Sequence, residues 1–165
     1  MFNLFGKKKE ELPAINVSDT DIVALADGKM IDVTTVSDPV FAQKMMGDSV
    51  AFTFDSDKVT LCSPANGTLS VMFPTGHSFG IKRNDGVELL VHCGINTVEA
   101  KGDGFKTLKK QGDTIKAGDP VVEVDVKKLS SKYDMSTMLI ITNANGKTIA
   151  FKEPKDVKRG EIISL

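Results

Sequence analysis

The chain has 165 residues and a mass of 17.8 kDa, the size of one domain with a full hydrophobic core. Apolar residues make up 41% and charged residues 26%, a globular composition that excludes a disordered chain. Lys plus Arg number 21 against 22 Asp plus Glu, so the net charge of −1 offers no general attraction for nucleic acid. The chain contains only two histidines, so any imidazole chemistry must use His77 or His92.

The sequence begins with a segment that predicts a flexible tail over residues 1–14, followed by a single domain over residues 15–165. In the tail, Phe2, Leu4 and Phe5 precede lysines 7–9, whereas a signal peptide has its basic residues first. This order allows at most a weak contact between the tail and an anionic membrane surface. Because the chain starts at Met1 and carries no attached permease sequence, we expect a free-standing protein.

The compartment is predicted from the cysteines and from hydropathy. Cys62 and Cys93 are too few for a disulfide framework and lack the close spacing of metal ligands, so we expect reduced thiols. No stretch approaches the roughly 18 apolar residues that cross a bilayer. Together these features predict a cytoplasmic protein.

Short β-strands are predicted along most of the chain. Turn-forming Gly, Asp and Asn recur roughly every eight to twelve residues, the spacing of an all-β sandwich or barrel. The runs between these turns are rich in Val, Ile, Thr and Phe and cover residues 22–25, 49–54, 59–61, 68–73, 87–93, 121–126 and 138–142. We therefore predict an all-β fold with antiparallel strands.

One or two very short helices interrupt the predicted strands. Asp38 is a suitable N-cap, Pro39 suits the first helical position, and Gly47 ends the stretch over residues 40–46. A second, weaker helical pattern covers residues 127–131.

Two segments, residues 63–69 and 112–121, resemble parts of lipoyl and biotinyl carrier domains, which implies a barrel-sandwich hybrid. Such a carrier also needs a lysine at the tip of a hairpin. Lys44, followed by Met45 and Met46, is the nearest match, but it falls in the predicted helix. The resemblance therefore supports the fold and argues against the carrier chemistry.

The run over residues 86–98 is the most informative strand. Its alternate residues form one apolar face, which consists of Leu89, Val91, Cys93 and Ile95. His92 lies on the other face beside Gly94, so we expect its ring to leave the core and to have open space next to it. An exposed strand histidine more often has no chemical role, so this alternation alone does not establish function.

His77 lies in a turn that leads into another predicted strand, two residues after Thr75. A single histidine there would more often be a turn residue satisfied by backbone groups. However, the loop over residues 82–86 is short enough for a hairpin, and His77 and His92 lie at comparable distances from it. We therefore predict that the two histidines face each other across the β-ladder.

Two neutral imidazoles suit three chemistries. The pair can bind zinc together with a carboxylate and a water. One imidazole can act as a general base if a nucleophile lies nearby. One imidazole can also accept a phosphoryl group while the other donates a hydrogen bond to its oxygens. The sequence lacks the H-E-x-x-H, G-x-S-x-G and P-loop signatures.

The sequence resembles the glucose-type enzyme IIA proteins of the sugar phosphotransferase system, which is driven by phosphoenolpyruvate. The resemblance rests on residues 88–98 and 101–105, and on residues 38–48, 63–68, 73–77 and 112–115 in family order. It implies an antiparallel β-sandwich around a shallow two-histidine site. It also implies that His92 accepts a phosphoryl group from the phosphohistidine of HPr, that His77 stabilises this group, and that Thr75 orients the site.

The resemblance also implies partners. The onward acceptor is a cysteine of an enzyme IIB domain attached to a membrane sugar permease, and no cofactor is required. A regulatory binding module is the alternative, in which phosphorylation selects permeases or kinases as partners and zinc is held by His77, His92 and a partner carboxylate. Partner docking is expected on an apolar surface, with two or three exposed residues among Phe41, Met45, Met46, Phe73, Phe79 and Val98.

Three positions depart from the family pattern. Asn96 stands where many members have Asp, which should reduce repulsion of the phosphoryl group but also alter contacts with a basic partner. Cys93 replaces a large apolar residue and is expected to pack in the core. Ser49 replaces a frequent Gly and is expected to affect only a local turn.

Overall fold

The computed structural model describes residues 12–165; residues 1–11, which hold most of the predicted tail and its apolar-basic motif, lie outside the described part. The strands are β1 (Gly28–Ile31), β2 (Ser49–Thr53), β3 (Lys58–Cys62), β4 (Gly67–Met72), β5 (Ser78–Arg83), β6 (Glu88–Cys93), β7 (Phe105–Thr107), β8 (Thr114–Ile115), β9 (Pro120–Asp125), β10 (Thr137–Asn143) and β11 (Lys155–Val157). The helices are α2 (Pro39–Ala42) and α3 (Val126–Ser130), with 3₁₀ turns η2 (Val33–Thr35) and η3 (Thr97–Ala100).

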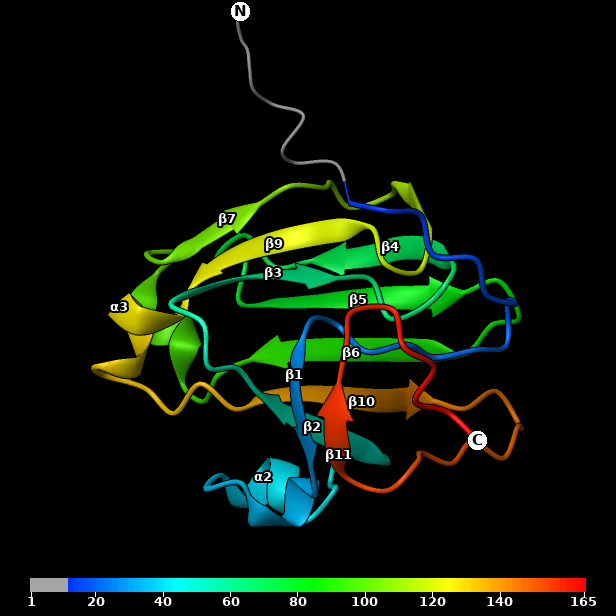
Figure 1. Cartoon of the computed structure of the whole chain (residues 1–165), viewed down its shortest axis with the longest axis horizontal. Helices are drawn as coiled ribbons and strands as arrows, with labels where there is room; N and C mark the ends of the chain where they lie inside the picture. The colour runs from blue at the N-terminus through cyan, green and yellow to red at the C-terminus, as the bar shows by residue number, and fades with distance from the viewer. Residues whose placement is uncertain (1–11) are drawn as a thin grey trace, which may run out of the picture.

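The strands form two antiparallel sheets. The larger sheet has the order β11-β1-β2-β10-β6-β5-β4-β8, and the smaller one has the order β3-β9-β7. In Figure 1, β7 and β9 lie at the top and α2 at the bottom, with strands β5, β6 and β10 between them. The predicted all-β antiparallel sandwich with very short helices is therefore confirmed, and the sandwich is not closed into a barrel.

The main hydrophobic core lies between the two sheets. It is formed by alternate residues of both, such as Leu61 and Val122 from the smaller sheet and Phe79 and Val91 from the larger one. Because strand side chains alternate between faces, strands such as β2, β6 and β10 contribute every second residue to this core. A second, smaller cluster lies on the opposite face of the larger sheet, beneath α2, and includes Phe41.

The short helices are confirmed with different bounds. Helix α2 begins where predicted, and the Asp38 side chain accepts a hydrogen bond from Val40 N at 2.8 Å. It ends at Ala42, earlier than predicted, because Lys44 adopts the left-handed conformation with φ 56°. Lys44 thus follows a helix and does not occupy a hairpin tip, which agrees with the sequence argument against a lipoyl-type carrier.

Two strand predictions need correction. Residues 22–25 are buried and make backbone hydrogen bonds to several segments, but their only β-bridge joins Val23 and Ile162, so they do not form a strand. Ile95 does not share the face of Leu89, because β6 ends at Cys93 and the positive φ of Gly94 turns the chain. Ile95 packs in the second cluster instead. Within residues 12–165 no helix combines the length and hydrophobicity that a membrane crossing requires.

Candidate functional site

The site is positioned by the β5–β6 hairpin at the middle of the larger sheet. The two strands pair antiparallel, with β10 on the other side of β6. The hairpin turn is held by Arg83, whose buried guanidinium donates two hydrogen bonds to Asp85, at 2.8 and 2.6 Å. These hydrogen bonds hold the pKa of Asp85 below its ordinary value, so the pair stays charged and the hairpin is closed at its far end.

The two histidines meet at the open end of this hairpin. Their ring centroids lie 5.2 Å apart and their planes cross at 82°. The predicted meeting across the ladder is therefore observed, but the register differs by one residue, because Ser78 lies directly opposite His92. His77 immediately precedes β5, and its carbonyl accepts a hydrogen bond from Cys93 N at 2.8 Å.

His92 is oriented by the turn that follows β6. Its Nδ1 lies 2.8 Å from the carbonyl oxygen of Gly94. A carbonyl only accepts hydrogen bonds, so Nδ1 carries the proton and, in the neutral ring, Nε2 keeps its lone pair. Glycine is required for this geometry, since its φ is +79° and a Cβ would lie 2.5 Å from Thr97 Cγ2.

The side chain of Thr75 contacts the ring of His77. Thr75 Oγ1 lies 2.5 Å from His77 Nδ1, and the ring is nearly completely buried, with 4% of the residue exposed. When the hydroxyl donates to Nδ1, the neutral ring carries its proton on Nε2. Gly76, with φ +76°, allows the turn that brings Thr75 and His77 to one side.

Two phenylalanines flank the pair. Phe41 of α2 lies against His92 with ring centroids 4.9 Å apart, and Phe73 contacts His77 edge-on at 5.3 Å. Asp38, the N-cap of α2, lies close enough for its charge to act on His92. The sequence predicts both phenylalanines only as docking residues and Asp38 only as a cap, because contacts between α2 and β6 are not visible in local patterns.

Burial keeps both imidazoles neutral. The pKa of His77 is lowered by burial and by the neighbouring His92. The pKa of His92 is lowered by burial, which outweighs the opposing effects of the hydrogen bond to Gly94 and of the Asp38 charge. A neutral ring is the nucleophilic form, so the site suits attack by a ring nitrogen near neutral pH.

The lowered pKa values predict a stability that depends on pH. Between the folded-state values and the ordinary value of 6.5, the unfolded chain binds more protons than the folded chain. The free energy of unfolding should therefore fall as the pH falls through 6.5, with a slope of at most about 1.4 kcal/mol per pH unit for each histidine. Urea denaturation between about pH 7.5 and about pH 5 measures this slope.

Carboxylates also titrate at the acid end of that range, so a matched variant is needed. The double variant His77→Gln, His92→Gln lacks both imidazoles and should show a shallower slope than the natural chain between pH 6.5 and the folded-state values. Equal slopes in the two proteins would show that neither histidine has a lowered pKa.

Several of the residues predicted for partner docking are exposed. Of the six predicted docking residues, four are exposed, more than the two or three expected: Met45 at 68%, Met46 at 40%, Phe73 at 39% and Val98 at 53%. Phe79 is in the main core and Phe41 is buried against His92. The turn after α2 accounts for the excess, because the early end of the helix leaves both methionines in solvent.

The family departures have clear structural positions, and the expected turn at Ser49 is wrong, because Ser49 is the buried first residue of β2. Cys93 is buried in the core, as predicted, where burial raises its thiol pKa to about 12 and Thr137 Oγ1 lies 3.5 Å from its Sγ. Asn96 is exposed and has φ 64°, a conformation that asparagine adopts more readily than most residues. Within residues 12–165 no three His, Cys, Asp or Glu side chains are arranged to hold a metal.

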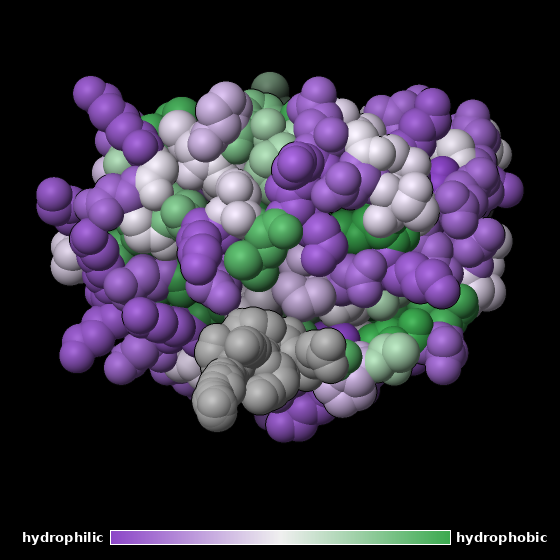
Figure 2. All heavy atoms as spheres, turned by 90° about the horizontal axis from the view of Figure 1, so that it is seen from above, coloured by the Kyte–Doolittle hydropathy of each residue, from purple (hydrophilic) through white to green (hydrophobic). Residues whose placement is uncertain are grey.

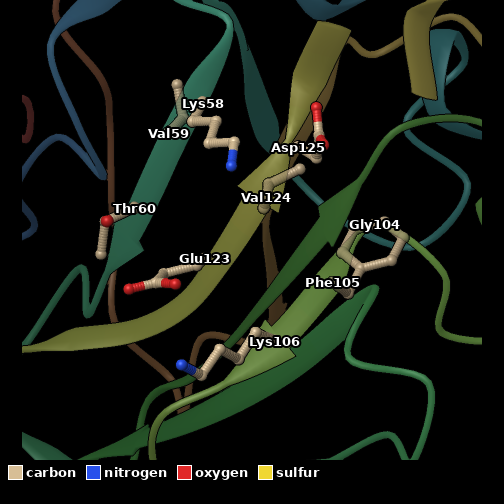
Figure 3. Close-up of a pocket in the computed structure, with 9 residues that line it drawn as sticks. All are labelled: Lys58, Val59, Thr60, Gly104, Phe105, Lys106, Glu123, Val124 and Asp125. Atoms are coloured by element: carbon tan, nitrogen blue, oxygen red, sulfur yellow. The ribbon is translucent and has the colours of Figure 1, made fainter. Parts of the chain in front are cut away.

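A groove of about 670 Å³ lies on the smaller sheet, and none of the residues that line it is Thr75, His77 or His92 (Figure 3). Its charged residues alternate in sign across the strands, with Lys58 opposite Asp125 and Lys106 opposite Glu123. Figure 2, the view from the side of β7 and β9, shows mainly hydrophilic side chains. This balanced, polar groove has the features of a solvated sheet face.

The fold and the site place the chain among antiparallel β-sandwiches that carry two histidines at the end of a central hairpin. The family model for the phosphoenolpyruvate-dependent sugar phosphotransferase system, EIIA 1, matches residues 20–147, a range that includes Thr75, His77, His92 and Gly94. The chain belongs to this family, as its sequence resemblance predicted, and is a phosphotransferase-system component.

The chain is similar both to proteins of about its own length and to much longer proteins. The glucose-specific EIIA component of Mycoplasma capricolum is 36% identical over 145 residues, covering 87% of this chain and 93% of the relative. That of Haemophilus influenzae is 34% identical over 163 residues, covering 98% and 94%. The glucose-specific EIICBA component of Staphylococcus carnosus is 36% identical over 145 residues, but the match spans 21% of that relative's length.

A solved structure agrees with the fold. Glucose permease IIA from Mycoplasma capricolum superposes with a TM-score of 0.81 at 36% sequence identity, covering 87% of this chain and 93% of that chain.

Proposed function

We propose that this chain carries a phosphoryl group on Nε2 of His92, accepting it from the phosphohistidine of HPr and passing it to a cysteine of an enzyme IIB domain during sugar uptake. The hydrogen bond between His92 Nδ1 and the Gly94 carbonyl supports this proposal most directly, because it leaves the lone pair on the outer nitrogen. The half-buried ring stays neutral and reaches solvent, as an acceptor in a protein–protein transfer must.

The transfer needs no proton movement at His92. The lone pair of Nε2 attacks phosphorus, an N–P bond forms, and the bond to the HPr nitrogen breaks with its electron pair returning to that ring. In the second step a cysteine thiolate attacks phosphorus, an S–P bond forms, and the N–P electron pair returns to Nε2. The Nδ1 proton remains on the ring throughout, since the Gly94 carbonyl holds it.

His77 supplies the charge stabilisation in this proposal. With Thr75 donating to its Nδ1, its Nε2–H is available to donate to phosphoryl oxygens on the adjacent ring. Phosphoryl transfer depends mainly on positioning and on stabilising charge at the equatorial oxygens. The edge-to-face arrangement at 5.2 Å suits one ring for attack and the other for donation.

The partners are proposed to dock on the apolar surface around the rings. Met45, Met46, Phe73 and Val98 are exposed: Phe73 contacts His77, the methionines follow α2, which carries Phe41, and Val98 lies in η3, which follows the Gly94 turn. Methionine side chains adapt to different surfaces, which suits a protein that meets HPr and a IIB domain in turn. The name of the Staphylococcus carnosus relative, an EIICBA component, joins A, B and C units and supports a IIB-type partner.

The proposal is tested by reconstitution with labelled phosphoenolpyruvate. The purified chain, enzyme I and HPr are mixed, and the label on the chain is located by mass spectrometry and by ³¹P NMR. We expect label only when both enzyme I and HPr are present, bound to Nε2 of His92. Label on Nδ1, or on a residue other than His92, would contradict the proposal.

Zinc fits the same two rings as a further ligand. His92, with its Nδ1 proton on Gly94, offers Nε2 as a zinc donor, and His77 offers Nε2 in the tautomer whose Nδ1–H donates to Thr75. Zinc prefers four ligands, and a carboxylate of a bound permease or kinase with a water would complete the set. Bound zinc would join the two proteins electrostatically and would compete with phosphorylation for the same nitrogens.

A further inference from the structure

The loop between α3 and β10 supports the site from behind His92. Its Ser136 carbonyl accepts a hydrogen bond from Gly94 N at 3.0 Å, and its Asp134 carbonyl accepts one from Ile95 N at 2.8 Å. The Gly94 carbonyl in turn accepts the Nδ1 proton of His92. The position of the atom that fixes the His92 tautomer therefore depends on where this loop lies.

The carboxylate of Asp134 connects this loop to α2. One oxygen accepts hydrogen bonds from the backbone N and the hydroxyl of Ser136, at 2.9 and 2.8 Å. The other accepts from the Ser37 hydroxyl at 2.9 Å. Ser37 immediately precedes Asp38, the cap of the helix that places Phe41 against His92.

We propose that Asp134 is a positioning residue for phosphoryl transfer, because its carboxylate joins the two walls of the His92 site: the Gly94 turn, and the α2 segment that carries Asp38 and Phe41. This inference rests on the proposed function of His92. It assigns to Asp134 the task of holding the Nδ1–H tautomer and the orientation of the ring.

Capping a local turn does not account for these contacts. A turn over residues 134–136 needs only the hydrogen bonds between Asp134 and Ser136. The bond to Ser37 spans 97 residues of sequence and adds nothing to that turn. Burial pushes the pKa of Asp134 up, but the hydrogen bonds from Ser136 and Ser37 outweigh this effect, so the pKa lies below its ordinary value and the carboxylate stays charged.

The inference is tested with Asp134→Ala and a matched control, Asp119→Ala. Asp119 also closes a turn, accepting from Lys116 N at 2.8 Å, but it lies beside β9 at the end remote from α3. We expect Asp134→Ala to slow phosphoryl acceptance from HPr by about tenfold, since small misplacements of a reacting group are costly. The control should match the natural chain.

A second measurement separates positioning from general loss of structure. Imidazole ¹⁵N NMR of the unphosphorylated protein should show His92 protonated on Nδ1 in the natural chain and in Asp119→Ala. In Asp134→Ala it should show a mixture of both tautomers. A wild-type rate together with a wild-type tautomer in Asp134→Ala would overturn the inference while the proposed function stands.

If Asp134→Ala does not fold, two variants of Ser37 test the inference instead. Ser37→Ala removes only the bond to α2, and Ser37→Thr keeps the hydroxyl. We expect Ser37→Ala to slow acceptance by about threefold and Ser37→Thr to restore most of the rate. Equal rates in both variants would overturn the inference. If the natural chain takes no label from HPr, the proposed function fails, and the NMR tautomer still decides the role of Asp134.

Discussion

Replacing His92 by alanine is expected to abolish phosphorylation of the chain by HPr. The substitution removes the only ring nitrogen in the site whose lone pair is left free by the hydrogen bond at Gly94. Because no neighbouring group replaces a missing nucleophile, the loss should exceed about a thousandfold in the initial rate of labelling. The measurement is transfer of label from phosphoenolpyruvate through enzyme I and HPr, followed over time.

His92→Gln is the matched control for packing. Glutamine fills much of the space beside Phe41 and keeps a polar group, but its amide nitrogen is not a nucleophile. Both variants should remain folded, because the main core lies on the other side of β6, and circular dichroism checks this. Label that persists on His77 in either variant would reverse the roles of the two histidines.

Replacing His77 by alanine should impair delivery of the phosphoryl group more than its acceptance. His92 keeps its tautomer and its nucleophilic nitrogen, since neither depends on His77. The variant loses the Nε2–H donor beside the phosphoryl oxygens, and removal of one such donor from a transition state typically costs about 10²–10³ in rate. Transfer from the labelled chain to a purified IIB domain, measured by rapid quench, should fall by about that factor.

Two further variants identify the atom responsible. His77→Gln retains an N–H group at the corresponding position and should recover part of the delivery rate. Thr75→Val removes the hydroxyl that orients the ring and should lower delivery without removing the donor. Delivery at the natural rate in His77→Ala would show that the second ring only packs against the first.

The alternation of apolar and polar residues in β6 was sufficient to place His92 off the main core. The burial of Leu89, Val91 and Cys93, with His92 half-buried, follows this pattern. The alternation fails at Ile95, because the positive φ values of Gly94 and Asn96 turn the chain, and such values depend on the surrounding packing. Hairpin length likewise predicted the meeting of the histidines, but not the one-residue offset in register.

Other parts of the fold had no local signal. Strands β7, β8 and β11 have two or three residues, too few for a repeating pattern, and form only against a partner strand. The sequence contains the glycine of the Gly94 turn, but no local pattern predicts that the carbonyl of Gly94 accepts a hydrogen bond from His92 Nδ1. The hydrogen bond from Ser37 to Asp134 joins segments far apart in the chain, so only the folded structure shows it.

The hydrogen bond from His92 to the Gly94 carbonyl has a consequence for the whole catalytic cycle. In the proposed transfers the same proton stays on the same nitrogen before, during and after each step, so every turnover would return the ring to the tautomer in which it started. The carrier needs neither a proton donor nor a water channel to be reset between its two partners. An apolar docking surface could therefore exclude solvent from both rings during the two proposed transfers. His92 would still return to the Nδ1–H tautomer, whose Nε2 is nucleophilic.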